Sequence, residues 1–259
     1  MNRFIVNNLR GLCFIFALLI LWELAGTHGW IDSTLIPTPS KIFRALLQML
    51  SSGQLFTDSL ASLRRVFLGF ALAAIAGIVL GLFIAWLGRR FEWVETPFEW
   101  LRPIPPIAWI PIAILWFGIG EKPAYFIVFL GAFFPILTNV VAGVKSTEPL
   151  LLNAARCLGA GRWLIITNVV LPSALPNIFT GLRVGFGVAW ICVITAEMVG
   201  AQSGLGYMIQ LNRLLLQTDK VLAGMVVIGF LGFIFNHLLL ALEKRCVRWK
   251  QPTIVGLIQ

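Results

Sequence analysis

The stretch LLNAARCLGAGRWLIITNVVLPSALP, residues 151–176, interrupts a chain that is otherwise mostly apolar. It holds two arginines, two glycines and two prolines. Just before it, Thr147 can cap a short helix that has Glu148 and Pro149 in its first turn. Gly159 is placed to end that helix. The helix carries leucines and alanines beside basic side chains, a pattern that indicates a surface made for a pocket on another protein.

The composition around this stretch indicates a membrane protein. Of the 259 residues, 59% are hydrophobic and 12% are charged, whereas charged residues make up about a quarter of an average soluble domain. Val66–Leu87 and Val221–Leu242 contain no Asp, Glu, Lys or Arg. Each is long enough to cross the hydrocarbon core of a bilayer, which takes roughly 20 apolar residues in a helix.

We predict an all-α membrane protein, a single transmembrane domain over residues 1–259 with six transmembrane helices. The third and fourth spans are rich in proline, and kinked helices of this kind persist in a bundle because neighbouring helices satisfy the freed backbone groups. The longest connection, residues 146–176, holds the short helix described above. The six predicted spans are about residues 9–27, 66–87, 104–119, 123–144, 177–200 and 221–242.

The distribution of Lys and Arg predicts that both termini are cytoplasmic. More basic residues, Arg102 and Lys145 among them, fall on the side of the N-terminus than on the opposite side. Arg64 and Arg65 are an exception, because they sit where the second span enters from outside. The net charge of +9 does not predict nucleic-acid binding, since the basic residues flank apolar runs and form no continuous stripe.

The interrupting stretch also carries a recognisable spacing. From Asn153 it reads Asn-Ala-Ala, three residues, Gly159, nine residues, Val169, one residue, then Leu-Pro. This resembles the EAA loop of permease subunits of ABC importers, E-A-A-x3-G-x9-I-x-L-P, with Asn153 in place of Glu and Val169 in place of Ile. The resemblance implies a cytoplasmic coupling helix that docks into a groove on an ATPase; an ordinary helix and loop is the alternative. The coupling residues that it implies are Asn153, Ala154, Ala155, Gly159, Leu171 and Pro172.

The resemblance extends over most of the chain, from about residue 22 to residue 249. RPIPPIAWIPIAILWFGIGE, FTGLRVGFGVAW and AEMVGAQSGLGYMI are similar to the nitrate, taurine, alkanesulfonate and bicarbonate branch of these permeases. This implies the type I importer fold and import of a small anion, with taurine or an alkanesulfonate first and nitrate or bicarbonate next. It also implies a homodimer in the bacterial cytoplasmic (inner) membrane, two cytoplasmic ABC ATPase subunits and an extracytoplasmic solute-binding protein.

No phosphate-binding loop of the form G-x-x-x-x-G-K-[ST] occurs in the chain. We therefore expect no cofactor on this chain, and ATP with Mg on the partner ATPase. We expect no catalytic residue and no metal ligand either. The four cysteines are scattered, with no CxxC pair, and are expected to be free thiols.

Ionisable residues in membrane spans usually face a cavity or a partner. Arg183 either attracts an anionic solute or forms a structural pair or extends to the headgroups. Glu197 and Glu23 lie toward the outer ends, where an acidic group repels an anion, so we expect structural hydrogen bonds or salt bridges from both.

Further polar residues within the spans are candidates for the lining of the translocation path. We assign Thr138, Asn139 and Thr195 to it together with Arg183; the alternative is hydrogen bonding between helices. The glycines at 69, 77, 81, 185 and 187 suit close helix packing. The segment AQSGLGYM, residues 201–208, resembles an external gate or re-entrant turn.

Two other classes of function compete with an ABC permease. A secondary transporter driven by an ion gradient is expected to show inverted internal repeats and unwound helix pairs, and neither is clear here. A membrane-embedded enzyme needs a catalytic constellation, and the chain has no HExxH motif, no paired acidic motif and no Ser/His arrangement.

Overall fold

The computed structural model describes residues 2–87, 97–98 and 100–247. Every regular element of more than two residues in this described part is a helix. The elements are α1 Asn2–Thr27, α2 Pro39–Ser51, α3 Gln54–Leu87, η2 Pro106–Trp109, α5 Ile110–Phe117, α6 Glu121–Lys145, α7 Pro149–Cys157, α8 Arg162–Ile165, η3 Ile166–Val170, α9 Leu171–Gly200, α10 Leu205–Leu214 and α11 Thr218–Cys246. The predicted all-α class is confirmed.

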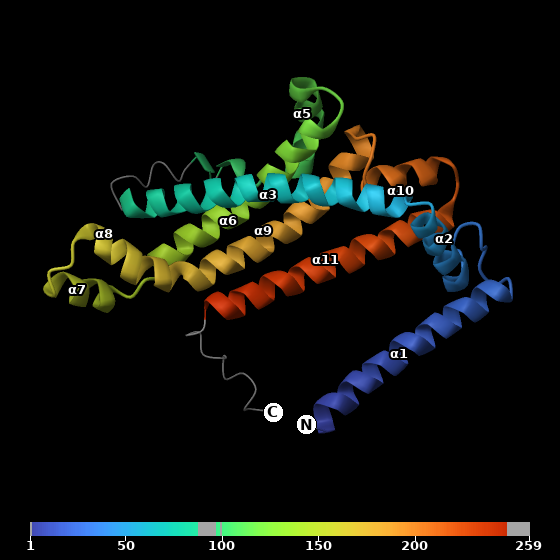
Figure 1. Cartoon of the computed structure of the whole chain (residues 1–259), viewed down its shortest axis with the longest axis horizontal. Helices are drawn as coiled ribbons and strands as arrows, with labels where there is room; N and C mark the ends of the chain where they lie inside the picture. Colours follow the sequence, from blue (N-terminus) through green and yellow to red (C-terminus); the bar gives the residue numbers. More distant parts are fainter. Residues whose placement is uncertain (1, 88–96, 99, 248–259) are drawn as a thin grey trace.

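Three long helices, α3, α6 and α9, form the centre of the molecule (Figure 1). Glycines on α3 allow it to approach α6 closely: a Cβ at Gly69 would meet Val128, and one at Gly81 would meet Val140. Residue numbers rise together along this contact, so the two helices are parallel. We call the two ends of this layer the α7 end and the α10 end, after the short helices that lie there in Figure 1.

Helix α9 packs on α6 in the opposite direction. Gly185 faces Ile136, and Gly181 faces both Ile136 and Asn139. The sequence-based prediction of close packing is therefore confirmed for the glycines at 69, 77, 81 and 185. It is wrong for Gly187, since a Cβ there would have no atom within 4 Å.

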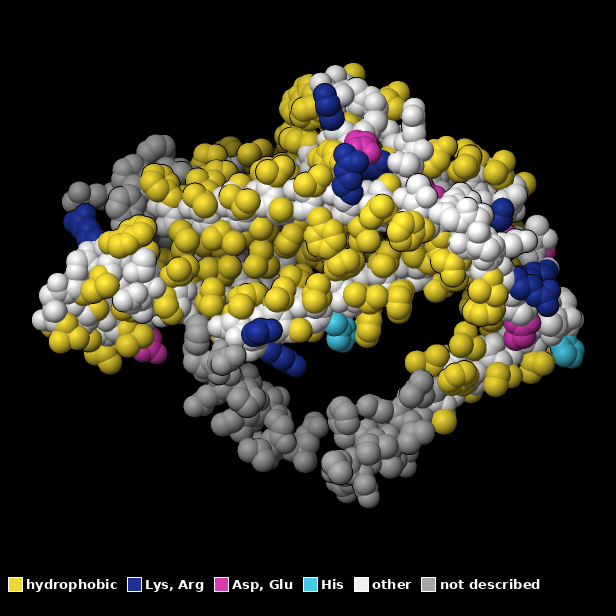
Figure 2. All heavy atoms as spheres, viewed as in Figure 1, with side chains coloured by type: hydrophobic (Ala, Val, Ile, Leu, Met, Phe, Trp, Pro, Cys, Tyr) yellow, Lys and Arg dark blue, Asp and Glu magenta, His cyan; other side chains and the backbone are white. Residues whose placement is uncertain are grey.

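Within the described residues, four helical segments are long and apolar enough to cross a membrane: Gln54–Ile84, Glu121–Lys145, Arg162–Gly200 and Thr218–Cys246. Cys13–Thr27 and Pro106–Phe117 are shorter apolar helices. They fall at the predicted spans 9–27 and 104–119, and α5 stands across the direction of the central helices in Figure 1. Hydrophobic side chains cover most of the face over α3, α9 and α11, and charged side chains gather near the helix ends (Figure 2).

After the first predicted span, Ile42, Leu46, Met49 and Leu50 fall at helical spacing, which predicts an amphipathic helix. This segment forms α2. Ile42 and Met49 are buried and Leu46 is half-buried, as the helical spacing predicts, whereas Leu50 is exposed. The buried face packs on α11 and α3. Glu23 of α1 accepts hydrogen bonds from the backbone N–H and the hydroxyl of Ser40 (3.0 and 2.7 Å), so the predicted structural role of Glu23 is confirmed.

Candidate functional site

The predicted coupling helix is α7, which projects at one end of the central layer (Figure 1). No residue of α7 is buried. Leu150 is 75% exposed, and Leu158, directly after the helix, is 87% exposed. Large apolar side chains in contact with water favour association, and this helix therefore presents a surface that nothing in the described part of the chain covers.

The ends of α7 are set by two local structures. Gly159 has φ +77° and ends the helix as predicted, with its N–H bonded to Arg156 O and the next N–H bonded to Ala155 O. These two hydrogen bonds form the Schellman motif, in which glycine takes the left-handed position without strain. The predicted cap at the other end is wrong: Glu148 is the N-cap residue, without a side-chain cap bond, and the buried Thr147 hydroxyl has no partner among the described residues.

The other predicted coupling residues lie near α7 or at the start of α9. Asn153 accepts a hydrogen bond from Arg156 (3.3 Å), and Ala154 and Ala155 follow it on α7. Leu171 and Pro172 begin α9 directly after the π-helical turn η3. The chain from Arg162 to Gly200 is thus one helical run of 39 residues. No contact tests the coupling role of these residues, which stays a prediction.

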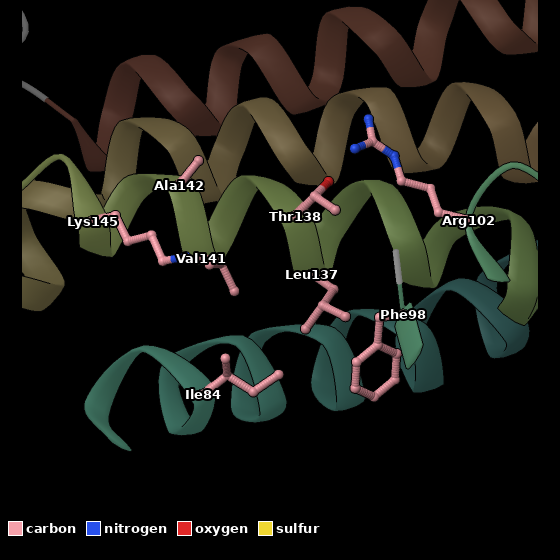
Figure 3. Close-up of a pocket in the computed structure, with 8 residues that line it drawn as sticks. All are labelled: Ile84, Phe98, Arg102, Leu137, Thr138, Val141, Ala142 and Lys145. Carbon is pink, nitrogen blue, oxygen red and sulfur yellow. The ribbon is translucent and has the colours of Figure 1, made fainter. Parts of the chain in front are cut away.

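Two cavities lie along α6 and share Arg102 and Thr138 as lining residues. The first, about 250 Å³, lies toward α3 and the α7 end; Figure 3 shows the residues that line it. The second, about 240 Å³, lies between α6, α9 and the segment that leads to η2. The first is lined by Ile84, Phe98, Arg102, Leu137, Thr138, Val141, Ala142 and Lys145, and the second by Arg102, Ile104, Pro106, Leu130, Gly131, Phe134, Pro135, Thr138, Asn139, Val184 and Val188.

The structure brings two of the four predicted path residues together. Thr138 and Asn139 line these cavities, while Thr195 and Arg183 do not. Arg183 instead lies 3.7 Å from Glu243 of α11. The hydroxyls of Thr138 and Thr195 donate hydrogen bonds to carbonyls one turn back on their own helices, as does the amide of Asn139. These hydrogen bonds lie within single helices and do not join two helices. Their role in transport stays a prediction.

A second charged region is buried at the α10 end. Arg65 of α3 is 1% exposed and forms a 2.7 Å ion pair with Glu197 of α9. Its other terminal nitrogen donates to the Ser203 hydroxyl (2.7 Å) and lies 3.3 Å from Glu121. The predicted structural role of Glu197 is confirmed. Its partner Arg65 was missed, because the two residues are 132 positions apart and the only signal was an arginine at the edge of an apolar run.

The same cluster fixes the turn that precedes α10. The second oxygen of Glu197 accepts hydrogen bonds from the Ser62 hydroxyl (2.8 Å) and the N–H of Gly206 (3.0 Å). Asp58 accepts from the N–H of Gly204 (2.9 Å), and Ser62 accepts from the N–H of Leu205 (2.9 Å). These bonds satisfy the free backbone donors at the start of α10. We call these residues, with Arg65 and Ser203, the turn cluster.

A family model described as the binding-protein-dependent transport system inner membrane component matches residues 77–248. The chain belongs to this family. It is an ABC transporter permease, a membrane transport subunit and not an enzyme.

Three curated relatives match along most of their length. The taurine transport system permease protein of Escherichia coli is 37% identical, over 90% of this chain and 86% of its own. A putative aliphatic sulfonates transport permease protein of Bacillus subtilis is 34% identical, over 93% and 88%. The bicarbonate transport system permease protein of Synechococcus elongatus is 34% identical, over 90% and 87%.

Solved structures show the same fold at lower identity. An amino acid ABC transporter is similar with a TM-score of 0.58 at 20% identity, covering 79% of this chain and 98% of that chain. A methionine ABC transporter gives a TM-score of 0.55 at 22% identity, covering 84% of this chain and 99% of that chain. The predicted type I importer permease fold is confirmed.

Proposed function

We propose that this chain is the permease subunit of an ATP-driven importer for a small anion, with taurine or alkanesulfonates first and nitrate or bicarbonate next. The observation that carries the proposal is α7, an exposed leucine-bearing helix at the position where the sequence matches the coupling spacing. The sulfonate and taurine transport named in two relatives favours that class of solute.

In this proposal α7 docks into a groove on a cytoplasmic ATPase, which binds ATP and Mg. Leu150, Leu151 and Leu158 enter the groove, since they are the large apolar side chains exposed there. Closure of the ATPase pair moves α7. The uninterrupted helical run Arg162–Gly200 carries that displacement into the membrane, because a continuous helix has no flexible linker to absorb it.

A second copy of the permease completes the pore, and each copy takes one of two ATPase subunits. The arrangement of α1 supports a partner chain. Its side chains Phe14, Ile15 and Phe16 are exposed, and Figure 2 shows an open space between α1 and α11 bordered by hydrophobic side chains. Helix α11 is likewise apolar and has no buried residue in its most apolar window. Lipid and a second permease are the surroundings that such helices require.

The α7 end faces the cytoplasm in this proposal, and the α10 end receives solute from an extracytoplasmic binding protein. Both termini then lie on the cytoplasmic side of the cytoplasmic (inner) membrane of a bacterium. Arg65, one of the two exceptions to the charge asymmetry, is consistent with this orientation: the Glu197 carboxylate neutralises its charge, so it is not a free basic residue of an outer loop.

The coupling proposal predicts that Gly159→Glu abolishes association with the ATPase and leaves the membrane fold intact. The substitution places a charged side chain on the docking surface and forces a non-glycine residue to φ +77°, which costs about 1–2 kcal/mol. The measurement is co-purification of the ATPase with the permease, together with ATP-driven uptake of taurine in proteoliposomes that contain the binding protein.

Two variants separate charge from strain. Gly161 also lies beside α7, but its φ is −67° and a Cβ there has open space, so Gly161→Ala should retain both association and uptake. Gly159→Ala introduces the strain alone and should weaken association in part. Normal co-purification and uptake by Gly159→Glu would show that α7 does not dock. Uptake that does not depend on ATP and is driven by an ion gradient would favour a secondary transporter.

A further inference from the structure

Arg102 is set apart from the other arginines described above by its surroundings. Its side chain is exposed and lines both cavities along α6. No hydrogen bond or ion pair joins the Arg102 side chain to any other residue that the structure describes. Figure 3 shows its guanidinium on the same side of α6 as the Thr138 hydroxyl, with the apolar Leu137, Ile84 and Phe98 on the side toward α3.

The lining of the two cavities is cationic and apolar. None of the described residues that line either cavity is acidic. Lys145 is a second cation in the first cavity, seven residues beyond Thr138 on α6, which is about 10 Å along the helix at 1.5 Å per residue. Thr138 and Asn139 are the uncharged polar side chains, and the other lining residues are apolar apart from Gly131.

We propose that Arg102 binds the acid group of a small organic anion here, and that the apolar lining receives its hydrocarbon part. A planar guanidinium donates two parallel hydrogen bonds to an oxyanion, and such charge-assisted bonds are among the strong ones. Ionisable residues in the membrane region usually face a cavity or a partner, and Arg102 lines two cavities and has no ion-pair partner among the described residues. Arg102 is thereby a residue of the transport path, a step that rests on the proposed function.

The shape and chemistry of the cavities select among anions. Each is smaller than the roughly 300–1,000 Å³ of pockets for drug-sized ligands. Nitrate and bicarbonate have no hydrocarbon part and leave the apolar lining without contact. Among the described lining residues, the ammonium group of taurine finds no carboxylate; Thr138 and Asn139 offer side-chain oxygens. A short unsubstituted alkanesulfonate therefore fits best.

An anionic lipid offers the same chemistry, an acid group on an apolar body, so the test must distinguish a free solute from a lipid. The complex of permease and ATPase is placed in nanodiscs of phosphatidylcholine, and equilibrium binding of labelled propane-1-sulfonate is measured without the binding protein. A second set of nanodiscs contains phosphatidylglycerol, and the lipid that stays bound to the purified complex is identified by mass spectrometry.

Arg102→Gln is the test variant. Arg102→Lys keeps the positive charge but lacks the planar guanidinium group that donates two parallel hydrogen bonds. Arg245→Gln is the matched control, an exposed arginine at the C-terminal end of α11 that lines neither cavity. We expect Arg102→Gln to weaken propane-1-sulfonate binding about tenfold or more, Arg102→Lys to have an intermediate effect, and Arg245→Gln to bind like the wild type. Arg102 is exposed, so its replacement leaves no hole in the core.

Retained phosphatidylglycerol that blocks the sulfonate in the wild type, and is absent from Arg102→Gln, supports the anion site with lipid as its occupant. Equal binding of both probes by wild type and Arg102→Gln overturns the proposal, and so does a wild type that binds neither. ATP-driven uptake by the complete wild-type system is measured separately. Its absence counts against the proposed function, whatever the binding experiment shows.

Discussion

Arg65 and Arg102 both belong to a helical membrane layer, and their charges meet opposite surroundings. At the α10 end, Arg65 is buried among Glu197, Ser203 and Glu121, with both terminal nitrogens bonded. Beside the middle of α6, Arg102 is exposed, and none of the described residues that line its two cavities is acidic. The first charge is neutralised by the chain itself, whereas no described residue forms an ion pair with the second.

The difference shows how an arginine in a membrane helix bundle can be assigned a role. A buried ion pair whose terminal nitrogens and carboxylate oxygens are hydrogen-bonded holds a local structure in one arrangement, here the turn before α10. An arginine that faces a cavity without a counter-charge gains favourable interactions only when a ligand enters. Both residues are arginines beside an apolar run, so the sequence does not distinguish them. The groups that surround each side chain decide its role.

The largest effect should come from breaking the turn cluster at Glu197. Glu197→Ala leaves the Arg65 charge buried without its main partner and also removes the acceptor for Ser62 and for the N–H of Gly206. Loss of one member of a buried pair costs about 3–5 kcal/mol of stability. Thermal unfolding of the purified permease–ATPase complex should show a much lower midpoint.

Two further variants sharpen this result. Glu121 is 44% exposed and 3.3 Å from Arg65, so Glu121→Gln should lower stability by less than about 1 kcal/mol. Replacing both buried partners, Arg65→Met with Glu197→Leu, should be less harmful than Glu197→Ala alone, because no unpaired charge remains. A Glu197→Ala complex that unfolds at the wild-type temperature would mean that the pair does not hold the turn.

Gly206→Ala should have the next largest effect, because it breaks the same turn sterically. A Cβ at Gly206 would collide with the backbone carbonyl of Ile194 and lie 2.8 Å from the Glu197 Cβ. Such overpacking costs about 1–3 kcal/mol. Gly187→Ala on α9 is the matched control, since a Cβ there meets open space. Equal unfolding temperatures for the two variants would contradict the close approach of α9 and α10.

The features that could be predicted from the sequence are those set by residues that are close together along the chain. Gly159 ends α7 because a left-handed position after a helix selects glycine, and the apolar face of α2 follows from spacing alone. Thr147 was assigned the cap of α7 because threonine is a common cap, but Glu148 and Pro149 begin the helix and Thr147 is buried. There, burial of Thr147 in the packed structure outweighs the tendency of threonine to cap a helix.

The parts of the site that escaped the sequence depend on distant contacts. Arg65 meets Glu197 only because α3 and α9 pack together at the α10 end. Arg102 was counted only as a basic residue on one side of the membrane, since nothing local shows that it lines a cavity with Thr138. Arg183 was the arginine assigned to the path, yet α11 brings Glu243 to it. In each case the tertiary surroundings of the arginine, and not its position in the sequence, indicate its role.

The smallest effect should come from Arg183→Gln, which tests whether the Arg102 cavity is the place where an anion binds. Arg183 and Glu243 are 3.7 Å apart with side chains 38% and 13% exposed, and a partly exposed pair of this kind contributes at most about 1 kcal/mol. The substitution should therefore leave propane-1-sulfonate binding unchanged and shift the unfolding midpoint little. If Arg183→Gln weakened binding as much as Arg102→Gln, the Glu243 pair would open to admit the anion. The distinction between paired and unpaired arginines would then apply only to Arg65, whose partners are buried with it.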